Sequence, residues 1–385
     1  MKHASKRRVL WVNGCPSLGG GEIAQIAIFR EIGRSFDVKA VLPDDAWGSL
    51  QSEVTSIGAP YWSMPLKRFE RTLRPDRLAR TAWELISRIR FLVRLIRAEK
   101  IDLVHAGYLF DLPYCTAAAK ICRVPVVWLI ENPERFDRFN RTVITACRLD
   151  AAVGTSSAIL REGLEAGMKA GITAVAGNPY NDAVFVAADR PRSAPGTVVI
   201  GFAGVFGERK GVIELCRAYS EISRKAKSVG RIRTELHLVG GGKPEYEQQM
   251  RSVLAEAGVL DETKFLGQVK TAAEMYEFYR SLDIYVMLSK REGMSVAMME
   301  AMASGLPCAI LSPWGDDAVI DGLTGVRLAT DRPNDVADAI WPLVESPELR
   351  ARLSAGAVAH LQQNYSPAAV ATKLQHVYEQ LLSDV

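Results

Sequence analysis

A pair of acidic residues, Glu292 and Glu300, stands out in the segment 283–310. The pattern of this segment predicts a strand, a loop, a helix over residues 296–303 and a second strand. Glu300 is the one polar residue of that helix, and a helix that is apolar on every face is expected to be buried. Because a buried carboxylate without a partner costs several kcal/mol, Glu300 must either form an ion pair or bind a polar ligand.

Glu292 lies in the loop before the same helix, next to Gly293, and Ser295 is a residue type that caps helix N-termini. Parallel α/β sheets bind ligands at the carboxyl ends of their strands, and the amides of a helix N-terminus bind phosphate. The segment therefore predicts an anion site with two carboxylates beside it, which suit sugar and ribose hydroxyls. The alternative is structural: Glu300 pairs with a core arginine or lysine, and Glu292 is a solvated loop residue.

A basic turn, Arg209-Lys210, follows a predicted strand over residues 198–203. Two positive charges at the carboxyl end of a strand can hold a leaving diphosphate. The alternative interpretation is a solvated surface turn.

Three consecutive glycines, Gly19, Gly20 and Gly21, separate a predicted strand over residues 9–12 from a predicted helix over residues 22–32. Glycines allow the backbone to approach a ligand closely. The loop lacks the GxGxxG pattern, which argues against a nicotinamide dinucleotide. The alternative is a plain turn between strand and helix.

One histidine, His105, ends a predicted strand over residues 102–105, and Asp111 follows nearby. It is a further catalytic candidate, although a lone histidine in such a position is more often structural.

Short strand patterns alternate with longer helical patterns through both halves of the chain, which predicts parallel sheets covered by helices on both faces. We expect strands over residues 9–12, 38–42, 102–105, 124–130 and 151–153, and again over 198–203, 235–239, 264–266, 284–288 and 308–311. We expect helices over residues 22–32, 77–99, 212–223, 246–257, 272–281, 296–303 and 367–382.

A polar segment rich in proline, residues 187–196, separates the two halves. We therefore predict an α/β chain of two Rossmann-like domains, residues 1–186 and 197–365, followed by a C-terminal helix within residues 366–385.

The composition excludes several other classes of protein. A net charge of +4 over 385 residues is too small to indicate nucleic acid, and no apolar run is long enough to span a membrane. The basic N-terminus lacks the apolar stretch of a signal peptide. The 6 cysteines form no CxxC pair and the 5 histidines do not cluster, so neither a metal site nor a disulfide framework is expected. These features predict a cytoplasmic protein.

Residues 67–100 form the most basic part of the chain, with eleven Lys/Arg against four Asp/Glu. Apolar residues within this stretch keep helical spacing along one face. A basic amphipathic helix can lie on anionic lipid, but an ordinary helix on a sheet also buries one face and solvates the other. A membrane surface is therefore a possible partner, and peripheral attachment is one hypothesis.

The segment EGMSVAMMEAMASGLP, which contains Glu292 and Glu300, resembles the E-x7-E signature of the retaining glycosyltransferases of family 4, which have the GT-B fold. This resemblance implies two domains that face each other across a cleft, with a C-terminal helix that crosses back to the first domain. It implies that Glu300 contacts the nucleotide ribose and that Glu292 lies at the donor sugar. It also implies that Gly293 and Ser295 bring backbone amides to the donor.

The segment VIGFAGVFGERKG resembles the family's V-G-R-x-x-x-x-K-G turn, so Lys210 and Arg209 are implied to bind the donor diphosphate. The chain departs from the family at Val205, where the family often has arginine. Gly20 and Gly21 resemble the family's G-G-x-E loop, which reaches toward the donor. The family's H-x-H pair is represented by His105 alone, because Gly107 occupies the second position.

The function implied is the transfer of a sugar from a nucleotide-diphosphate donor to a saccharide or lipid-linked acceptor, with retention, in cell-envelope polysaccharide or glycolipid assembly. No metal or other cofactor is expected, because lysine, arginine and the helix dipole can neutralise the leaving group. Two alternatives are a nucleotide-sugar epimerase on the same scaffold and a non-catalytic partner protein with the same fold.

Overall fold

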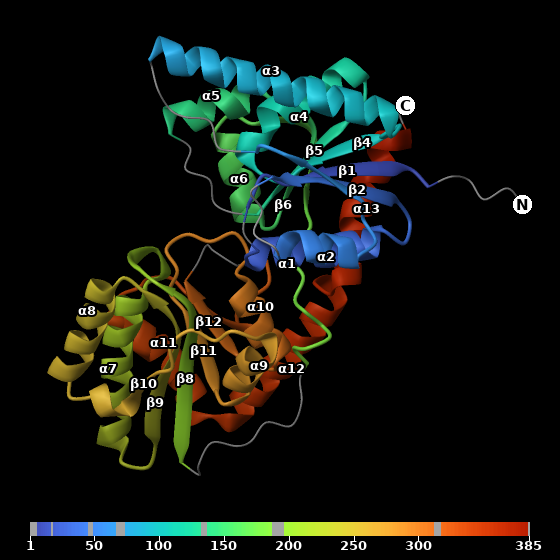
Figure 1. Ribbon diagram of the computed structural model, residues 1–385. Helices are drawn as coiled ribbons and strands as arrows, with labels where there is room; N and C mark the ends of the chain where they lie inside the picture. Colours follow the sequence, from blue (N-terminus) through green and yellow to red (C-terminus); the bar gives the residue numbers. More distant parts are fainter. Residues whose placement is uncertain are drawn as a thin grey trace, which may run out of the picture. The chain divides into compact units, whose positions relative to one another are not determined.

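The computed structural model describes residues 6–16, 18–44, 49–66, 74–131, 137–186, 196–311 and 317–383. The chain divides into two compact units, which Figure 1 shows by colour along the sequence. Unit 1 comprises Met1–Pro179 and Pro367–Val385, and unit 2 comprises Tyr180–Ser366. Residues 180–186, which the sequence analysis includes in the first domain, thus group with unit 2. The expected linker, residues 187–196, lies outside the described residues except for Gly196.

Unit 1 contains a seven-stranded sheet in the order β3-β2-β1-β4-β5-β6-β7, and all of its strand pairs are parallel. The strands are β1 (Arg8–Val12), β2 (Asp37–Pro43), β3 (Tyr61–Met64), β4 (Leu103–Ala106), β5 (Val126–Ile130), β6 (Arg148–Gly154) and β7 (Lys169–Val175). The sequence analysis missed only β3 and β7, the two edge strands. Both alternate exposed with less exposed residues, so neither has the continuous apolar run of the buried strands.

The helices of unit 1 cover both faces of this sheet (Figure 1). They are α1 (Gly20–Ile32), α2 (Ser49–Ser56), α3 (Pro75–Ala98), α4 (Leu112–Cys122), α5 (Arg138–Ala146), α6 (Ser157–Glu165) and α13 (Pro367–Ser383). Helices α3 and α4 pack together over one face, where Leu92, Ile96 and Trp128 belong to the main apolar core. Helix α13, at the end of the chain, packs against α1 at its beginning.

Unit 2 contains a six-stranded parallel sheet in the order β10-β9-β8-β11-β12-β13. The strands are β8 (Thr197–Phe206), β9 (Arg233–Gly242), β10 (Thr263–Phe265), β11 (Ile284–Met287), β12 (Cys308–Leu311) and β13 (Gly325–Leu328). The helices are α7 (Val212–Val229), α8 (Pro244–Glu256), α9 (Ala272–Arg280), α10 (Val296–Ala303), α11 (Pro333–Glu345) and α12 (Pro347–Asn364).

Both sheets are doubly wound: the chain proceeds outward from a central strand in one direction, then returns and proceeds in the other. In unit 2 the direction reverses between β8 and β11, which are hydrogen-bonded neighbours. Open parallel sheets bind ligands at the carboxyl ends of the strands at such a reversal. The loops that follow β8 and β11 are therefore where a site in unit 2 is expected.

The predicted α/β architecture with two parallel sheets is confirmed. Among the described residues, no helix is both long enough and apolar enough to cross a membrane.

Candidate active site

The basic turn after β8 and the loop after β11 lie against each other in unit 2. Arg209 and Lys210 are in a short 3-10 turn that ends at Gly211, whose φ of 65° is in the left-handed region. A Cβ atom on Gly211 would lie 2.2 Å from the backbone oxygen of Leu288, so no larger residue fits this contact. The Lys290 amide also donates to the Arg209 carbonyl, at 2.8 Å. Backbone contacts thus position the side chains of Arg209 and Lys210 beside the loop that follows β11.

Glu292 is the acceptor that these two basic residues share. Its Oε1 atom lies 2.6 Å from Lys210 Nζ and 3.0 Å from Arg209 Nη1. Glu292 is 7% exposed, whereas the Arg209 side chain is 55% exposed. Arg209 Nη1 also donates to the carbonyl of Arg291, at 2.9 Å. The interpretation of Glu292 as a solvated loop residue is therefore wrong, and three predicted site residues form one cluster.

This cluster keeps a net positive charge, because two cations share one carboxylate. Ammonium and guanidinium groups have three and five N–H donors respectively, so most of their donors remain for an anion. The arrangement is suited to a group with two negative phosphates, which both cations can contact.

Helix α10 begins directly after this cluster, and the predicted bounds of this helix are confirmed. Ser295 caps it, since its hydroxyl accepts a hydrogen bond from the Met298 amide at 3.4 Å. Gly293 and Ser295 are both buried in the loop that leads into the helix. The amides of the first turn are therefore next to the basic cluster in sequence, and both features attract anions.

Glu300 lies one turn into α10. The hydroxyl of Tyr279, on α9, donates to its Oε2 atom at 3.1 Å. Burial raises the pKa of Glu300 to about 7, and the hydrogen bond from Tyr279 opposes that shift. No lysine or arginine in the described part of the chain pairs with Glu300, so the structural alternative of a core ion pair is not observed.

The expectation that α10 is buried on every face is wrong. Val296, Ala297 and Glu300 are partly exposed, while most of the remaining residues of the helix are buried. Because residues four apart lie on the same side of a helix, Val296 and Glu300 belong to one half-open face. Glu300 is accessible to a ligand on that face.

In unit 1, Gly20 and Gly21 form the start of α1, and Gly19 precedes them as its N-cap residue. A Cβ atom on Gly21 would lie 2.8 Å from Oε2 of Glu131, the residue that follows β5. The glycine loop therefore packs closely on a buried carboxyl group.

Sequence reasoning missed Glu131. Burial raises the pKa of Glu131 to about 8, the Gln25 side chain opposes this shift, and the charge of Glu22 adds to it. Neither of its carboxyl oxygens has a hydrogen-bond partner of acceptable geometry among the described residues, and the same holds for the side-chain amide of Gln25. The one sequence signal is an acidic residue placed directly after a fully apolar strand.

His105 is fully buried between the sheet, α1 and α13. Its Nδ1 atom lies 2.6 Å from the hydroxyl of Tyr378, on α13, and its ring meets the edge of Phe29. Burial lowers the pKa of His105 to about 3, so the ring is neutral at physiological pH. This geometry favours the structural alternative, in which His105 fastens α13 to unit 1, and we leave it out of the proposed site.

Asp111, which follows His105 in sequence, is also fully buried. It accepts hydrogen bonds from the amides of Gly14 and Tyr108, each at 3.1 Å, and from the hydroxyl of Tyr114. It thereby holds the loop after β1.

Among the described residues, no three His, Cys, Asp or Glu side chains lie together in a way that would hold a metal ion. The independence of the reaction from metal stays a prediction.

Comparison with known proteins identifies the region that contains the cluster. Residues 197–346 match the family model described as glycosyl transferases group 1. A D-inositol 3-phosphate glycosyltransferase of Corynebacterium aurimucosum is 30% identical over 188 residues, which cover 49% of this chain and 44% of that protein. A lipopolysaccharide core biosynthesis mannosyltransferase, LpcC of Rhizobium leguminosarum, is 28% identical over 197 residues, which cover 49% of this chain and 53% of that protein. The matches thus span about half the length of these relatives.

Solved structures resemble the whole chain. The Anabaena protein HepE, in complex with UDP and glucose, has a TM-score of 0.75 and 18% identity, and the match covers 97% of this chain and 100% of that one. A glycosyltransferase of Rickettsia africae has a TM-score of 0.79 and 14% identity, with coverage of 99% and 100%. At these identities the likeness shows the fold, and the GT-B fold expected from the sequence is confirmed.

Proposed function

Because residues 197–346 match the family model of glycosyl transferases group 1, we propose that the chain transfers a sugar from a nucleotide-diphosphate donor to an acceptor hydroxyl with retention of configuration. The observation that carries this proposal is the cluster in which Lys210 and Arg209 share Glu292. A positive cluster next to the start of a helix, at the reversal of a doubly wound sheet, is suited to a nucleoside diphosphate.

Lys210 and Arg209 hold the donor diphosphate in this proposal, and the amides near Gly293 and Ser295 add hydrogen bonds to it. The charges are already in place before the reaction, so they stabilise the negative charge that develops on the leaving group. Loss of one such donor typically lowers the rate by about 100- to 1000-fold.

Glu300 accepts hydrogen bonds from the ribose hydroxyls. Its half-open position leaves carboxyl lone pairs for this purpose, since the Tyr279 hydroxyl is its one partner among the residues that the structure describes. Glu292 lies at the donor sugar, where its negative charge stabilises an oxocarbenium-like sugar.

The bond between the anomeric carbon of the sugar and the diphosphate oxygen breaks, and the electron pair leaves with the diphosphate. The acceptor hydroxyl forms the new bond on the same face of the sugar. Its proton passes to the departing phosphate oxygen, so the reaction needs no metal and no separate base from the protein.

The names of the relatives support a class of product. One is a lipopolysaccharide core mannosyltransferase and another a D-inositol 3-phosphate glycosyltransferase, so we infer a hexosyl transfer to a saccharide or lipid-linked acceptor in cell-envelope assembly. A nucleotide-sugar donor of this kind is found in the cytoplasm, where we place the protein.

Two other functions are alternatives to sugar transfer. A non-catalytic protein is favoured by Val205, which replaces a basic residue and whose side chain is 65% exposed. An epimerase would use the same donor cluster without an acceptor.

The first experiment measures donor binding by thermal shift with UDP-, GDP- and ADP-sugars, for the wild type, Lys210→Ala and Glu300→Ala. Lys264→Ala is the matched control, because Lys264 pairs with Glu235 on the surface of the same unit. We expect one nucleotide series to stabilise the wild type and the control but neither site variant. If no nucleotide or nucleotide sugar binds the wild type, the proposal fails.

The second experiment follows the donor without an acceptor by NMR. Slow hydrolysis with retention releases the sugar first in the donor's own anomeric form, before mutarotation. Release of the opposite anomer contradicts retention, and a changed sugar still attached to its nucleotide identifies the epimerase.

A further inference from the structure

Helix α3 is unusual in its charge. Its 24 residues contain six arginines and two acidic residues, in the sequence PDRLARTAWELISRIRFLVRLIRA. At 1.5 Å per residue the helix is about 36 Å long, so it forms one extended edge of unit 1. One of its faces is fixed by the core, where Leu92, Leu95 and Ile96 are at most 7% exposed.

The opposite face of α3 exposes large apolar side chains. Trp83 is 66% exposed and Ile86 is 44% exposed. The outer face of a helix on a sheet is normally polar, and neighbouring exposed apolar side chains indicate an interaction surface.

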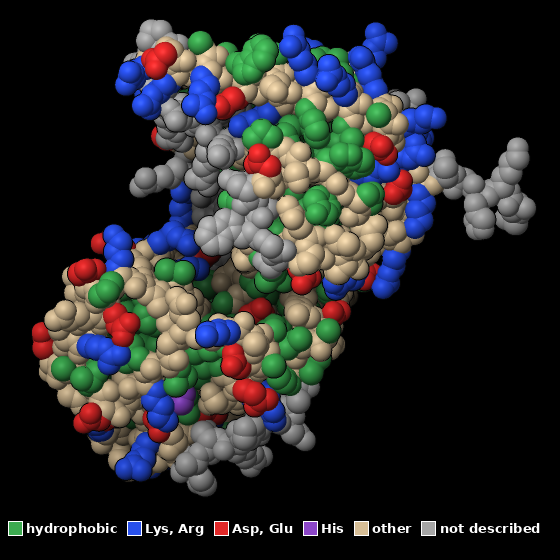
Figure 2. Space-filling view, viewed as in Figure 1, with side chains coloured by type: hydrophobic (Ala, Val, Ile, Leu, Met, Phe, Trp, Pro, Cys, Tyr) green, Lys and Arg blue, Asp and Glu red, His purple; other side chains and the backbone are tan. Residues whose placement is uncertain are grey.

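Three arginines continue the same stripe toward the end of the helix. Residues 83, 86, 90, 94 and 97 are three or four positions apart, so they lie on one side of α3. Arg90, Arg94 and Arg97 are exposed, and none of them forms an ion pair within the described part of the chain. We call Trp83, Ile86, Arg90, Arg94 and Arg97 the outer stripe of α3. Figure 2 shows basic and apolar side chains together along the top of the view, where α3 lies in Figure 1.

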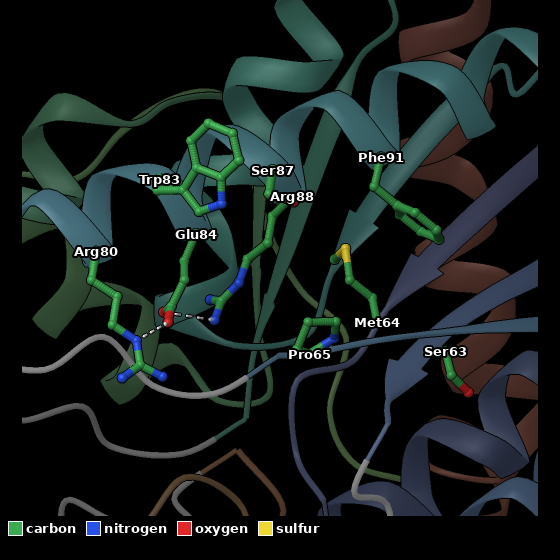
Figure 3. A pocket seen from close by; sticks show the side chains of 9 residues that line it. All are labelled: Ser63, Met64, Pro65, Arg80, Trp83, Glu84, Ser87, Arg88 and Phe91. Atoms are coloured by element: carbon green, nitrogen blue, oxygen red, sulfur yellow. Dashed lines mark hydrogen bonds and ion pairs between the residues drawn. The ribbon is translucent and has the colours of Figure 1, made fainter.

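A hollow of about 320 Å³ lies beside this stripe (Figure 3). It is lined from α3 by Arg80, Trp83, Glu84, Ser87, Arg88 and Phe91, and from the segment that ends β3 by Ser63, Met64 and Pro65. Arg80 Nε lies 3.0 Å from Glu84 Oε1 and Arg88 Nη2 lies 3.8 Å from Glu84 Oε2, so two arginines share one carboxylate and the hollow also keeps a net positive charge. The hollow leaves the indole of Trp83 without close packing on that side.

We propose that the outer stripe of α3 docks on an anionic lipid bilayer. The helix lies in the plane of the interface, Trp83 and Ile86 enter the region between headgroups and acyl chains, and Arg90, Arg94 and Arg97 contact lipid phosphates. Tryptophan suits this boundary because its ring is apolar and its N–H can bond to water or headgroups.

The same residues fit other polyanions less well. Ile86 is aliphatic and offers nothing to a phosphodiester backbone, and the net charge of the whole chain is only +4. An acidic protein would need a partner for Trp83 as well as for the arginines. A bilayer supplies the apolar and the anionic parts together.

The test is co-sedimentation of the full chain with vesicles of phosphatidylcholine alone or mixed with phosphatidylglycerol. We expect binding to the anionic vesicles only, with a loss at high salt. The triple variant Arg90→Gln, Arg94→Gln, Arg97→Gln removes three charges, which lowers the partition coefficient on the order of a hundredfold. Trp83→Ser lowers it roughly tenfold.

Matched controls come from unit 2. Arg224, Arg251 and Arg332 have side chains that are 74%, 46% and 76% exposed, so changing all three to glutamine removes the same charge from another surface. Leu323→Ser changes an apolar side chain that is 56% exposed. All of these sites are exposed, so unchanged thermal unfolding checks that the variants fold.

Three outcomes overturn the proposal. The first is a wild type that does not bind anionic vesicles at low salt, which leaves an acidic protein as the partner of the stripe. The second is equal binding to neutral and anionic vesicles. The third is a control triple variant that loses as much binding as the α3 triple variant.

Discussion

Lys210 should contribute to the stability of the protein as well as to donor binding. Lys210→Ala leaves the buried Glu292 with Arg209 alone, and Arg209 is half exposed. We expect a loss of about 2 kcal/mol in the free energy of unfolding, because a buried carboxylate loses its closest partner. Arg209→Ala should cost less than about 1 kcal/mol, since exposed ion pairs contribute little. Urea unfolding of both variants measures the difference.

A double variant completes this prediction. Lys210→Met combined with Glu292→Gln removes the buried carboxylate together with its closest partner, and the charge that remains, on Arg209, is 55% exposed, so much of the lost stability should return. Donor turnover should stay low, because the Lys210 ammonium and the Glu292 carboxylate are both absent and only Arg209 remains to contact the diphosphate. Recovery of turnover together with stability would show that the cluster is structural.

Glu300 should make donor binding depend on pH. Burial raises its pKa to about 7, so near neutral pH it is partly protonated before the donor binds. Ribose hydroxyls donate hydrogen bonds and favour the ionised carboxylate, so binding lowers this pKa and releases a proton. Donor affinity should therefore increase as the pH rises from about 6 to 8. Titration calorimetry in two buffers measures both the affinity and the proton release.

Glu300→Gln is the control for this prediction. Glutamine cannot ionise, so its affinity should be lower and nearly independent of pH across this range. The same slope in the variant would assign the titration to another group.

Some residues of the candidate site were not predictable from the sequence. Glu292 and Glu300 were found because a short segment with a capping residue contains both. Glu131 was missed because the groups around it come from α1, and only the fold brings Gly21, at the start of α1, against its carboxyl group. The role of His105 likewise depends on Tyr378, at the far end of the chain.

At the scale of the element, the sequence predicted the bounds of buried helices and strands better than those of exposed ones. The bounds of α10 and β12 follow the sequence expectation, since a serine cap opens the helix and an apolar run forms the strand. Three edge strands, β3, β7 and β13, were missed. An edge strand faces solvent along part of its length, so it lacks the apolar run by which a buried strand is found.

The turn that presents Lys210 should depend on Gly211. Alanine at Gly211 should be destabilising for two reasons. The backbone has a positive φ of 65°, which strains a residue with a side chain, and the Cβ atom would lie 2.2 Å from the Leu288 carbonyl oxygen. We expect a stability loss of more than about 3 kcal/mol, or a displaced turn with weak donor binding. Thermal unfolding and a donor thermal shift measure the two effects.

Gly230→Ala is the matched control. Gly230 ends α7 with a φ of 76°, and a Cβ atom there would meet nothing within 4 Å. Alanine should therefore cost only the backbone strain, about 1–2 kcal/mol, and should leave donor binding unchanged. Equal effects at the two glycines would mean that the contact with Leu288 does not position the turn.

At the scale of the whole molecule, the chain returns to its first unit after it completes the second. Helix α12 ends at Asn364 in unit 2, and α13 begins at Pro367 in unit 1. Each unit has its own parallel sheet, so calorimetry should resolve two unfolding transitions. The proposed donor cluster lies in unit 2 alone, and a bound nucleotide should raise the midpoint of that transition.

Two fully buried leucines, Leu361 on α12 and Leu374 on α13, test this division. Each change to alanine should cost about 2–5 kcal/mol from the cavity that it leaves. Leu361→Ala should lower the transition that nucleotide raises, whereas Leu374→Ala should lower the other one, because α13 packs on α1. If both variants lower the same transition, the two units unfold together. In that case α13 does not stabilise unit 1 independently of unit 2.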